Sequence, residues 1–258
     1  MRTVSDVWII SGTDTGVGKT VVAAGIAATA GARGYRVAVI KPAESGIPPD
    51  AGIESDIEAV IRLAGPAAAR SLVSYPDALA PLAAAEEAGV VPLAIGDVIE
   101  AVRVTAGNYD LVLVEGAGGL LVPMGEGGWT VAQLAVALRC PVVVVCRADL
   151  GTLNHTALSL EALEHRAVSA SVVVGSWPDE PELVHWRNLT DLPGQLDGVV
   201  PAGAGALEPE LFRSRAPGWF TARLYGRADP GRLRLDGVPG PPPPWPVDAF
   251  PPPWPGEA

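Results

Sequence analysis

The sequence predicts an α/β protein built on a doubly wound, mostly parallel β-sheet. Apolar runs that suit strands alternate along most of the chain with helical patterns, and this alternation is typical of parallel strands joined by crossover helices. The apolar runs lack a period of two, as expected when helices cover both faces of a sheet. Ligands of such sheets bind beyond the carboxyl ends of the strands, so we expect the functional residues in the segments that follow the strands.

Six strands and six helices are expected up to residue 201. The expected strands are Val7–Ser11, Arg36–Lys41, Asp110–Glu115, Pro141–Cys146, Val168–Val174 and Gly198–Pro201. The expected helices are Lys19–Ala32, Glu54–Leu63, Gly96–Ala106, Val131–Ala137, Thr152–His165 and Pro181–Leu192. Helices on both faces of one sheet make a three-layer sandwich.

The first expected strand runs into a glycine-rich turn with the layout of a phosphate-binding loop. Residues 12–20 read Gly-Thr-Asp-Thr-Gly-Val-Gly-Lys-Thr, and an alanine-rich helix follows. Glycines let backbone N–H groups surround phosphate oxygens, and the helix N-terminus adds partial positive charge. Lys19 is placed to reach the β- and γ-phosphates, and the Thr20 hydroxyl to hold Mg²⁺. This layout predicts a P-loop NTPase-like fold, with a turn that binds nothing as the alternative. The expected nucleotide contacts here are Gly16, Val17, Gly18, Lys19, Thr20 and Val21.

The second expected strand ends at Lys41, close to the phosphate loop. A lysine there can stabilise charge on a transferring phosphoryl group or on a carboxylate-like substrate; a solvated strand-end lysine is the alternative. Lys19 and Lys41 are the only lysines in the chain, and a compact ammonium suits a crowded phosphate oxygen better than a guanidinium does. Asp56 opens the next expected helix, either as an N-capping acid or as a ligand of Mg²⁺.

The third expected strand ends in a carboxylate beside glycines. Glu115 in that position suits a Mg²⁺ ligand of a phosphoryl-transfer site. A structural ion pair is the alternative, because an unpaired glutamate would be costly to bury. The segment after it, which consists of Gly116, Ala117 and Gly118, would let the backbone approach the nucleotide or substrate.

The loops after the later strands offer an anion site and the means to recognise a base. Gly151–Asn154 opens a helix and suits an anion such as a substrate carboxylate, unless Thr152 or Asn154 is simply the helix cap. Base choice is expected from Gly175, Ser176, Pro201, Ala202 and Gly203. A side-chain amide can pair with adenine on two atoms, and this chain offers a glycine and a serine instead. We therefore expect relaxed nucleotide choice, with ATP, CTP or another triphosphate accepted.

Composition narrows the class of protein. The chain has 258 residues, is 48% hydrophobic and carries a net charge of −11. Scattered basic residues and a negative net charge argue against a nucleic-acid partner. We expect no membrane span and no signal peptide, and the two cysteines suggest no disulfide framework. A cytoplasmic enzyme is the expectation.

With these segments in view, the chain resembles the dethiobiotin synthetase family. The resemblance is carried by residues 12–20, by Lys41-Pro42 with Ser45-Gly46, by residues 114–119 (Val-Glu-Gly-Ala-Gly-Gly) and by residues 150–155 (Leu-Gly-Thr-Leu-Asn-His). It covers about residues 5–226. Two positions depart from some relatives: Gly16 stands where they carry a glutamate, and Gly175-Ser176 where they place an asparagine that reads adenine.

The resemblance implies a ligase of biotin biosynthesis that uses Mg²⁺ and a nucleoside triphosphate. In the family, 7,8-diaminopelargonic acid and CO₂ form a carbamate, which takes the γ-phosphoryl group to give a carbamic-phosphoric anhydride. The second amine then closes the ureido ring of dethiobiotin. The implied partners are thus the diamine, CO₂ and a second copy of the chain.

The resemblance also implies roles for individual residues. The Mg²⁺ ligands would be Thr20, Asp56 and Glu115. The catalytic residues would be Lys19, Lys41 and Thr15. Thr15 and Ser45 match positions that contact phosphate, substrate or carbamate. In the implied homodimer, the substrate carboxylate would reach Gly151, Thr152 and Asn154 of the second subunit.

Two other classes stay open. The first is another ligase on the same scaffold, of the cobyrinate amidation type, which usually carries a glutaminase domain with a nucleophilic cysteine; neither Cys140 nor Cys146 has such a context. The second is a partition-type nucleotide switch that binds a partner protein. That class has a lysine five residues before the loop lysine, where this chain has Asp14.

The chain is expected to divide into a nucleotide-binding domain, residues 1–226, and a proline-rich tail, residues 227–258. The tail holds 11 of the 26 prolines, and proline suits neither helices nor sheet ladders. An extended segment without a packed core is expected.

Removal of residues 227–258 should therefore leave the melting temperature and the turnover close to those of the full chain, because a proline-rich segment buries little apolar area. Calorimetry and a steady-state assay of both forms measure this. A fall of many degrees in the truncated form would show that the tail packs on the body.

Overall fold

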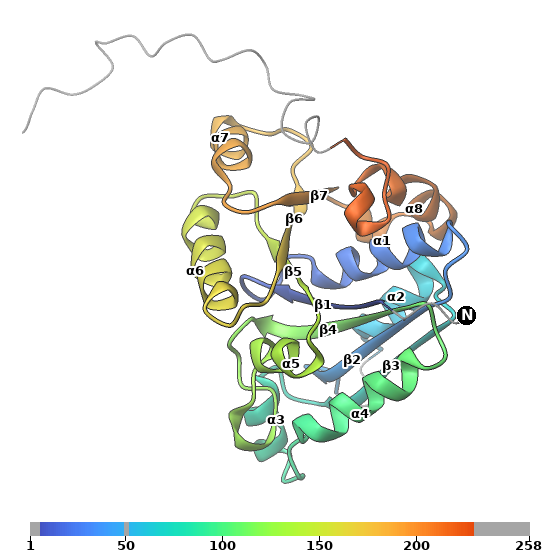
Figure 1. Ribbon diagram of the computed structural model, residues 1–258, viewed down its shortest axis with the longest axis vertical. Helices are drawn as coiled ribbons and strands as arrows, with labels where there is room; N and C mark the ends of the chain where they lie inside the picture. The colour runs from blue at the N-terminus through green and yellow to red at the C-terminus, as the bar shows by residue number, and fades with distance from the viewer. Residues whose placement is uncertain (1–5, 49–51, 230–258) are drawn as a thin grey trace, which may run out of the picture.

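Seven parallel strands form one central sheet in the computed structural model, which describes residues 6–48 and 52–229 (Figure 1). The strand order is β3-β2-β4-β1-β5-β6-β7, and every pair of neighbouring strands is parallel. The strands are β1 (Asp6–Gly12), β2 (Val37–Ser45), β3 (Ala68–Tyr75), β4 (Leu111–Gly119), β5 (Val142–Cys146), β6 (Ala170–Trp177) and β7 (Leu196–Pro201). The predicted doubly wound α/β fold is confirmed.

Helices cover both faces of this sheet and complete a three-layer sandwich (Figure 1). On one face lie α1 (Lys19–Gly31), α2 (Asp56–Ala64) and α8 (Pro209–Arg215). On the other lie α3 (Pro81–Glu87), α4 (Ile95–Ala106), α5 (Val131–Leu138), α6 (Thr152–Glu164) and α7 (Leu183–Asp191). Short 3₁₀ turns occur at Glu126–Gly128, Ala204–Ala206, Ala216–Gly218 and Ala222–Leu224.

The continuous apolar sequences of the strands are explained by the helices that cover both faces of the sheet. In β5, Val143 and Val145 face the cluster under α1, while Val142 and Val144 face the cluster under α4 and α5. All four side chains are fully buried. A strand that buries both faces reads as a continuous apolar run, which is the pattern seen in the sequence.

The chain reverses its direction of winding at β1, and this places the crevice of the sheet. The connections after β1 lead to β2 and β3 on one side, whereas β5, β6 and β7 follow on the other. β1 lies between β4 and β5. In open α/β sheets the ligand site lies at such a switch point, beyond the carboxyl ends of the strands.

Three expected strands continue further than the sequence indicated. β2 does not end at Lys41 but runs to Ser45, so Pro42 and Ser45 belong to a strand. Pro42 is tolerated because β2 pairs with β4 only from Val37 to Ile40 and afterwards pairs with β3 alone. Similarly, β4 includes Gly116–Gly119 and β6 includes Gly175, which the sequence had placed in the following loops.

Three elements were missed. β3 is an edge strand with mostly half-buried residues, so it lacks the apolar run that marked the others. α3 and α8 are only seven residues long. Each has proline in its first turn, a signal of a helix start that the sequence did contain.

The end of the described chain is tied to the body at two backbone positions. The Arg227 N–H donates to the Pro217 carbonyl at 2.7 Å, and the Ala228 N–H donates to the Phe220 carbonyl at 2.8 Å. Residues 227–229 therefore pack with the sheet domain, whereas the rest of the expected tail, residues 230–258, lies outside the described residues.

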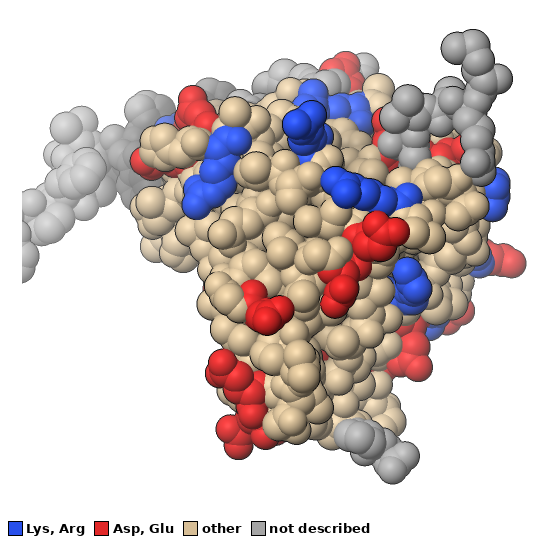
Figure 2. All heavy atoms as spheres, turned by 60° about the horizontal axis from the view of Figure 1, so that its bottom comes forward, with Lys and Arg blue, Asp and Glu red and all other residues tan. Residues whose placement is uncertain are grey.

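Figure 2 shows Lys and Arg side chains scattered among acidic ones on the face in view, rather than gathered into one basic stripe. Within residues 6–48 and 52–229, no helix combines the length and the apolar character that crossing a membrane requires.

Candidate active site

The phosphate loop connects β1 to α1, and two of its glycines have left-handed backbones. Gly16 has φ of 72° and Gly18 has φ of 96°, a region that only glycine adopts without strain. Gly18 also lies close to β6, because a Cβ there would come within 2.7 Å of the Gly175 carbonyl oxygen. Backbone conformation explains both glycines, and crowding is a second reason for glycine at position 18.

The N-terminus of α1 is free to receive an anion. Its N-cap is Gly18, and no side chain caps the first turn. The first N–H groups of a helix have no partner within the helix, and they carry the positive end of the helix dipole. A phosphate group is a ligand that suits both properties.

Lys19 begins α1 and folds back over the loop. Its Nζ donates to the Asp14 carbonyl oxygen at 2.9 Å, and the side chain is buried. Burial lowers the pKa of Lys19, and the neighbouring Lys41 ammonium adds to this effect, while the Glu115 carboxylate opposes it. A phosphate oxygen bound in the loop could therefore replace the Asp14 carbonyl oxygen as the acceptor for the Lys19 ammonium.

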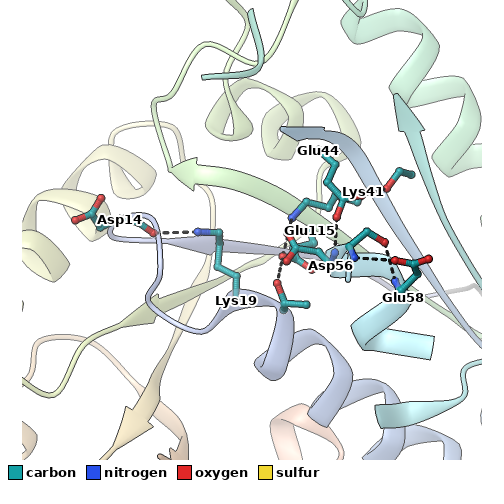
Figure 3. A network of polar contacts seen from close by, with 10 residues as sticks. Asp14, Lys19, Lys41, Glu44, Asp56, Glu58 and Glu115 are labelled. Atoms are coloured by element: carbon teal, nitrogen blue, oxygen red, sulfur yellow. Dashed lines mark hydrogen bonds and ion pairs between the residues drawn. The ribbon is translucent and has the colours of Figure 1, made fainter. Parts of the chain in front are cut away.

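A second network joins β2, β4 and α2 beside the loop (Figure 3). Lys41 Nζ donates to Glu115 Oε1 at 2.9 Å and contacts Asp56 Oδ2. The Thr20 hydroxyl donates to the same Glu115 oxygen at 2.8 Å. Glu115 has no exposed surface, and Lys41 is 2% exposed. Lys41 is thus not the solvated strand-end lysine that the sequence left open.

The charges in this network adjust one another. Burial alone would lower the pKa of Lys41, but the Glu115 and Asp56 carboxylates raise it well above its usual value. Burial raises the pKa of Glu115 against the opposing effect of Lys41. For Asp56, burial raises the pKa of the carboxyl, but Lys41 together with Thr20 and Lys19 lowers it by more, so the pKa lies below its usual value. Lys41 therefore stays an ammonium ion throughout the physiological range.

The residues predicted to hold Mg²⁺ come together at this network. Asp56 and Glu115 both contact Lys41, and Thr20 contacts Glu115. Glu115 Oε2 is buried without a hydrogen-bond partner, so it retains an acceptor for a cation. Hydroxyl and carboxylate oxygens are the ligands that Mg²⁺ prefers, together with phosphate oxygens of a substrate. In the described part of the chain, no group of three or more His, Cys, Asp or Glu residues could hold a metal by itself.

The network and the loop line one pocket of about 470 Å³. Most of the predicted catalytic and phosphate-binding residues face it. Its lining consists of Thr15, Gly16, Gly18, Lys19, Thr20, Val21, Lys41, Ser45, Asp56, Ala78, Leu79, Glu115, Ala117 and Gly118. Elements far apart in sequence therefore contribute to a single site.

Other predicted residues lie outside that lining. Val17 is buried beneath the loop, and Gly116 packs on Val131. Among the residues expected to read the base, Gly175 packs against the phosphate loop. This pocket is lined by none of Gly175, Ser176, Pro201, Ala202 and Gly203. The expected carboxylate-binding residues Gly151, Thr152 and Asn154 also do not reach the pocket of their own chain.

Gly175 faces the phosphate loop rather than open space. A Cβ at this position would come within 2.0 Å of the Val17 carbonyl oxygen. Any larger residue would have to displace the loop, which is a packing reason for glycine here. Ser176, by contrast, is exposed and supplies the hydroxyl of this segment.

Hydrogen bonds hold several residues of the loop after β5, and the tip of this loop is an exposed apolar side chain. The Ala148 carbonyl accepts from Asn188 Nδ2 at 2.8 Å, and His185 Nε2 lies 3.2 Å from Asp149 Oδ1. The Thr152 hydroxyl donates to the Arg147 carbonyl at 2.7 Å, so it does not cap α6, whose N-cap is Gly151. Leu150 at the tip is 86% exposed.

The loop after β5 also forms hydrogen bonds with the phosphate loop. Arg147 Nη2 lies 2.8 Å from Asp14 Oδ2 and donates to the Thr15 carbonyl at 3.2 Å. The other Asp14 oxygen accepts from the Thr15 N–H at 2.7 Å. The position five residues before Lys19 is thus an acid that organises the loop.

Sequence reasoning missed three residues of this region. Ala78 and Leu79 line the pocket from the connection between β3 and α3, two elements that were not recognised. Glu44 is buried next to the network. Its place between Lys41 and Ser45 was the only signal in the sequence.

A family model described as "AAA domain" matches residues 6–200. The chain is 48% identical over 228 residues to "ATP-dependent dethiobiotin synthetase BioD" of Streptomyces avermitilis, covering 86% of this chain and 95% of that protein. It is 50% identical over 235 residues to the protein of the same description in Frankia casuarinae, covering 88% and 98%. Among solved structures, the MinC:MinD cell division complex of Aquifex aeolicus matches with a TM-score of 0.46 at 18% identity, covering 82% of this chain and 86% of that chain.

Proposed function

Because the chain belongs to the family of ATP-dependent dethiobiotin synthetases, we propose that its phosphate-loop pocket converts 7,8-diaminopelargonic acid and CO₂ to dethiobiotin by phosphoryl transfer. The activity itself follows from the family: the protein is an ATP-dependent ligase of biotin biosynthesis. The observation that carries the residue assignments is that both lysines of the chain meet in one pocket with Thr20, Asp56 and Glu115.

The reaction begins with a carbamate. One amine of the substrate attacks CO₂, forming a carbon–nitrogen bond and losing a proton. The carbamate oxygen then attacks the γ-phosphorus of ATP, and the bond to the bridging oxygen breaks as ADP leaves. Both lysines line the pocket; we assign Lys41 to neutralise the carbamate and Lys19 to neutralise the γ-phosphate. Thr15 and Ser45 line the same pocket and are assigned to phosphate and carbamate contacts.

Ring closure follows from the mixed anhydride. The second amine attacks its carbonyl carbon, phosphate leaves, and the amine loses a proton. Binding in the pocket would hold both amines of one substrate near the same carbon, and such proximity can supply much of the rate.

Thr20, Asp56 and Glu115 are the residues that we assign to Mg²⁺. The ion would neutralise charge on the β- and γ-phosphate oxygens. The three side chains and the buried, unpartnered Glu115 Oε2 support this assignment.

We assign nucleotide contacts to the phosphate-loop residues Gly16, Val17, Gly18 and Val21, to Gly116, Ala117 and Gly118 of β4, and to Gly175, Ser176, Pro201, Ala202 and Gly203 for the base. Val21 supports this placement, because a Cβ at Gly205 would lie 3.0 Å from its Cγ2 atom. The segment after β7 therefore lies against the start of α1.

A homodimer with shared sites completes the proposal. The substrate carboxylate would bind at Gly151, Thr152 and Asn154 of the second subunit. Two features support this: these residues do not line the pocket of their own chain, and the braced loop before them presents Leu150 to solvent. Leu150 is the exposed apolar side chain next to these residues, and we assign it to the interface.

The direct test of the proposal mixes the protein with Mg-ATP, bicarbonate and 7,8-diaminopelargonic acid and looks for dethiobiotin by mass spectrometry. ATP hydrolysis should depend on the diamine and on bicarbonate. Hydrolysis that instead requires a protein or DNA surface would contradict the proposal.

Lys41→Ala should lower turnover by about 10²-fold or more, the scale of removing one preorganised charge donor. It also leaves Glu115 buried without its cation, so a lower melting temperature is expected. Circular dichroism at the assay temperature separates the two effects, because turnover is then compared only where the variant is folded. Steady-state kinetics and calorimetry measure both, and turnover of Lys41→Ala near that of the unchanged protein would contradict the role.

Leu150→Glu should convert the dimer to a monomer and raise the KM for the diamine, because a charge at the centre of an apolar contact opposes association. Analytical ultracentrifugation reports the oligomeric state. Val91→Glu is the matched control, since Val91 is 87% exposed on the connection between α3 and α4. A dimer that persists in Leu150→Glu rules out this interface.

ATP and CTP should support comparable turnover, with CTP equal to or better than ATP. Ser176 offers one hydroxyl, and Gly175 faces the phosphate loop, so no side-chain amide pairs with adenine at these two positions. Selectivity depends on polar groups that the wrong base leaves unpaired. Turnover with ATP, CTP, GTP and UTP is compared at matched Mg²⁺, and a preference for ATP of about a hundredfold or more over all three others would show the inference to be wrong.

A further inference from the structure

Glu44 is a buried carboxylate that the reaction does not use. It lies on β2 between Lys41 and Ser45, and it is 3% exposed. Oε2 accepts a hydrogen bond from the Ser71 hydroxyl of β3 at 2.8 Å, and Oε1 accepts one from the backbone N–H of Asp56. Among the described residues no cation pairs with it. A buried carboxylate with only neutral donors is costly, so its place needs an explanation.

The contact to Asp56 occurs at the first residue of α2, where a helix has unpaired N–H groups. The N-cap Ser55 hydroxyl already accepts from the Glu58 N–H at 3.2 Å, and the Glu58 carboxylate accepts from the Ser55 N–H at 2.8 Å. This capping box leaves the Asp56 N–H unsatisfied, and Glu44 supplies its acceptor. Figure 3 shows Glu44 reaching this helix start from β2, while Glu58 reaches it from within α2.

The helix start determines where the Asp56 carboxylate points. That side chain is 42% exposed and is held in the pocket by Lys41. Because solvent surrounds much of it, its direction depends on the backbone from which it projects. Glu44 ties that backbone to β2, the strand that also carries Lys41. Lys41, which contacts the Asp56 carboxylate, and Glu44, which accepts from the Asp56 N–H, therefore both belong to β2.

Glu44 itself is not placed to touch nucleotide or substrate. Glu44 does not line the phosphate-loop pocket; it lines a neighbouring pocket together with Ser55, Glu58 and Ser71. Both its oxygens accept hydrogen bonds, and the one from the Asp56 N–H connects it to the phosphate-loop pocket, which Asp56 lines.

We propose that Glu44 is a positioning residue that fixes Asp56 for metal–nucleotide binding through the hydrogen bond from the Asp56 N–H. This inference rests on the proposed function, in which Asp56 holds Mg²⁺. Groups that orient a metal ligand typically contribute about 10–100-fold in metal affinity. Glu44 would thus act on the proposed Mg²⁺ ligand Asp56 without touching the ion itself.

Three variants separate positioning from charge. Glu44→Gln keeps an oxygen for the Asp56 N–H and an amide that can donate to Ser71, so it should bind metal within about twofold of the unchanged protein. Glu44→Ala removes the acceptor and should weaken binding by about tenfold or more. Glu44→Asp shortens the side chain and withdraws the oxygen, so it should behave like Glu44→Ala while leaving less empty volume. Ser71→Ala, the matched control, removes the other hydrogen bond and should leave metal binding unchanged.

The measurement is the affinity for Mn²⁺ in the presence of ATP, followed by electron paramagnetic resonance, with the KM for the diamine measured alongside. The proposal predicts weaker Mn²⁺ binding in Glu44→Ala and Glu44→Asp and little change in that KM. Unchanged Mn²⁺ affinity in Glu44→Asp overturns it, and so does equal loss in Glu44→Gln, which would make charge the cause. If Glu44→Ala does not fold, Glu44→Asp and Glu44→Gln still decide. The Mn²⁺ titration needs no diamine, so its result stands apart from whether the unchanged protein makes dethiobiotin.

Discussion

The buried carboxylate of Glu115 is the constraint around which the site is built. It lies in the central part of the sheet, with no exposed surface, where an unpaired charge would be strongly destabilising. Lys41 and Thr20 satisfy one of its oxygens. Because these partners come from β2 and from the start of α1, the requirement to pair one carboxylate brings three elements to one point.

The phosphate loop depends on a different constraint, which is space. Gly18 and Gly175 approach each other so closely that neither position has room for a side chain. Arg147 and Asp14 hold the loop from the other side. Backbone N–H groups can surround a phosphate only where side chains are missing, so the packing that excludes side chains also prepares the loop for its ligand. Charge and crowding are thus separate causes that act on neighbouring parts of one pocket.

The sequence predicted those parts of the fold that repeat a simple pattern. The buried strands and the longer helices were found because each carries a continuous apolar run or a helical period. The edge strand β3 was missed because it is only half buried, and with it the pocket residues Ala78 and Leu79. The extent of β2 was misjudged because proline and glycine usually mark a loop, whereas here the neighbouring strand had already diverged.

Among the site residues, motifs placed Lys19, Thr20 and Glu115 because their chemistry follows a strand directly. Glu44 could not be assigned in the same way. The role that we propose for it depends on a contact with the backbone of Asp56, twelve residues away, and no property of the glutamate itself indicates that partner. The local sequence shows which side chains have the chemistry for a role in the site. Contacts between residues far apart in the sequence determine which of these side chains act together.

Pro42 has a consequence for the balance between stability and activity. β2 and β4 pair as far as Ile40 and then separate, and a proline two residues later has no N–H to continue a ladder. If the two strands paired along their whole length, the sheet would gain hydrogen bonds and the gap that holds Lys41 and Glu115 would close. The enzyme therefore lacks part of a possible β-ladder, and its crevice stays open. A variant chosen at this position only for higher thermal stability would be expected to lose catalytic activity.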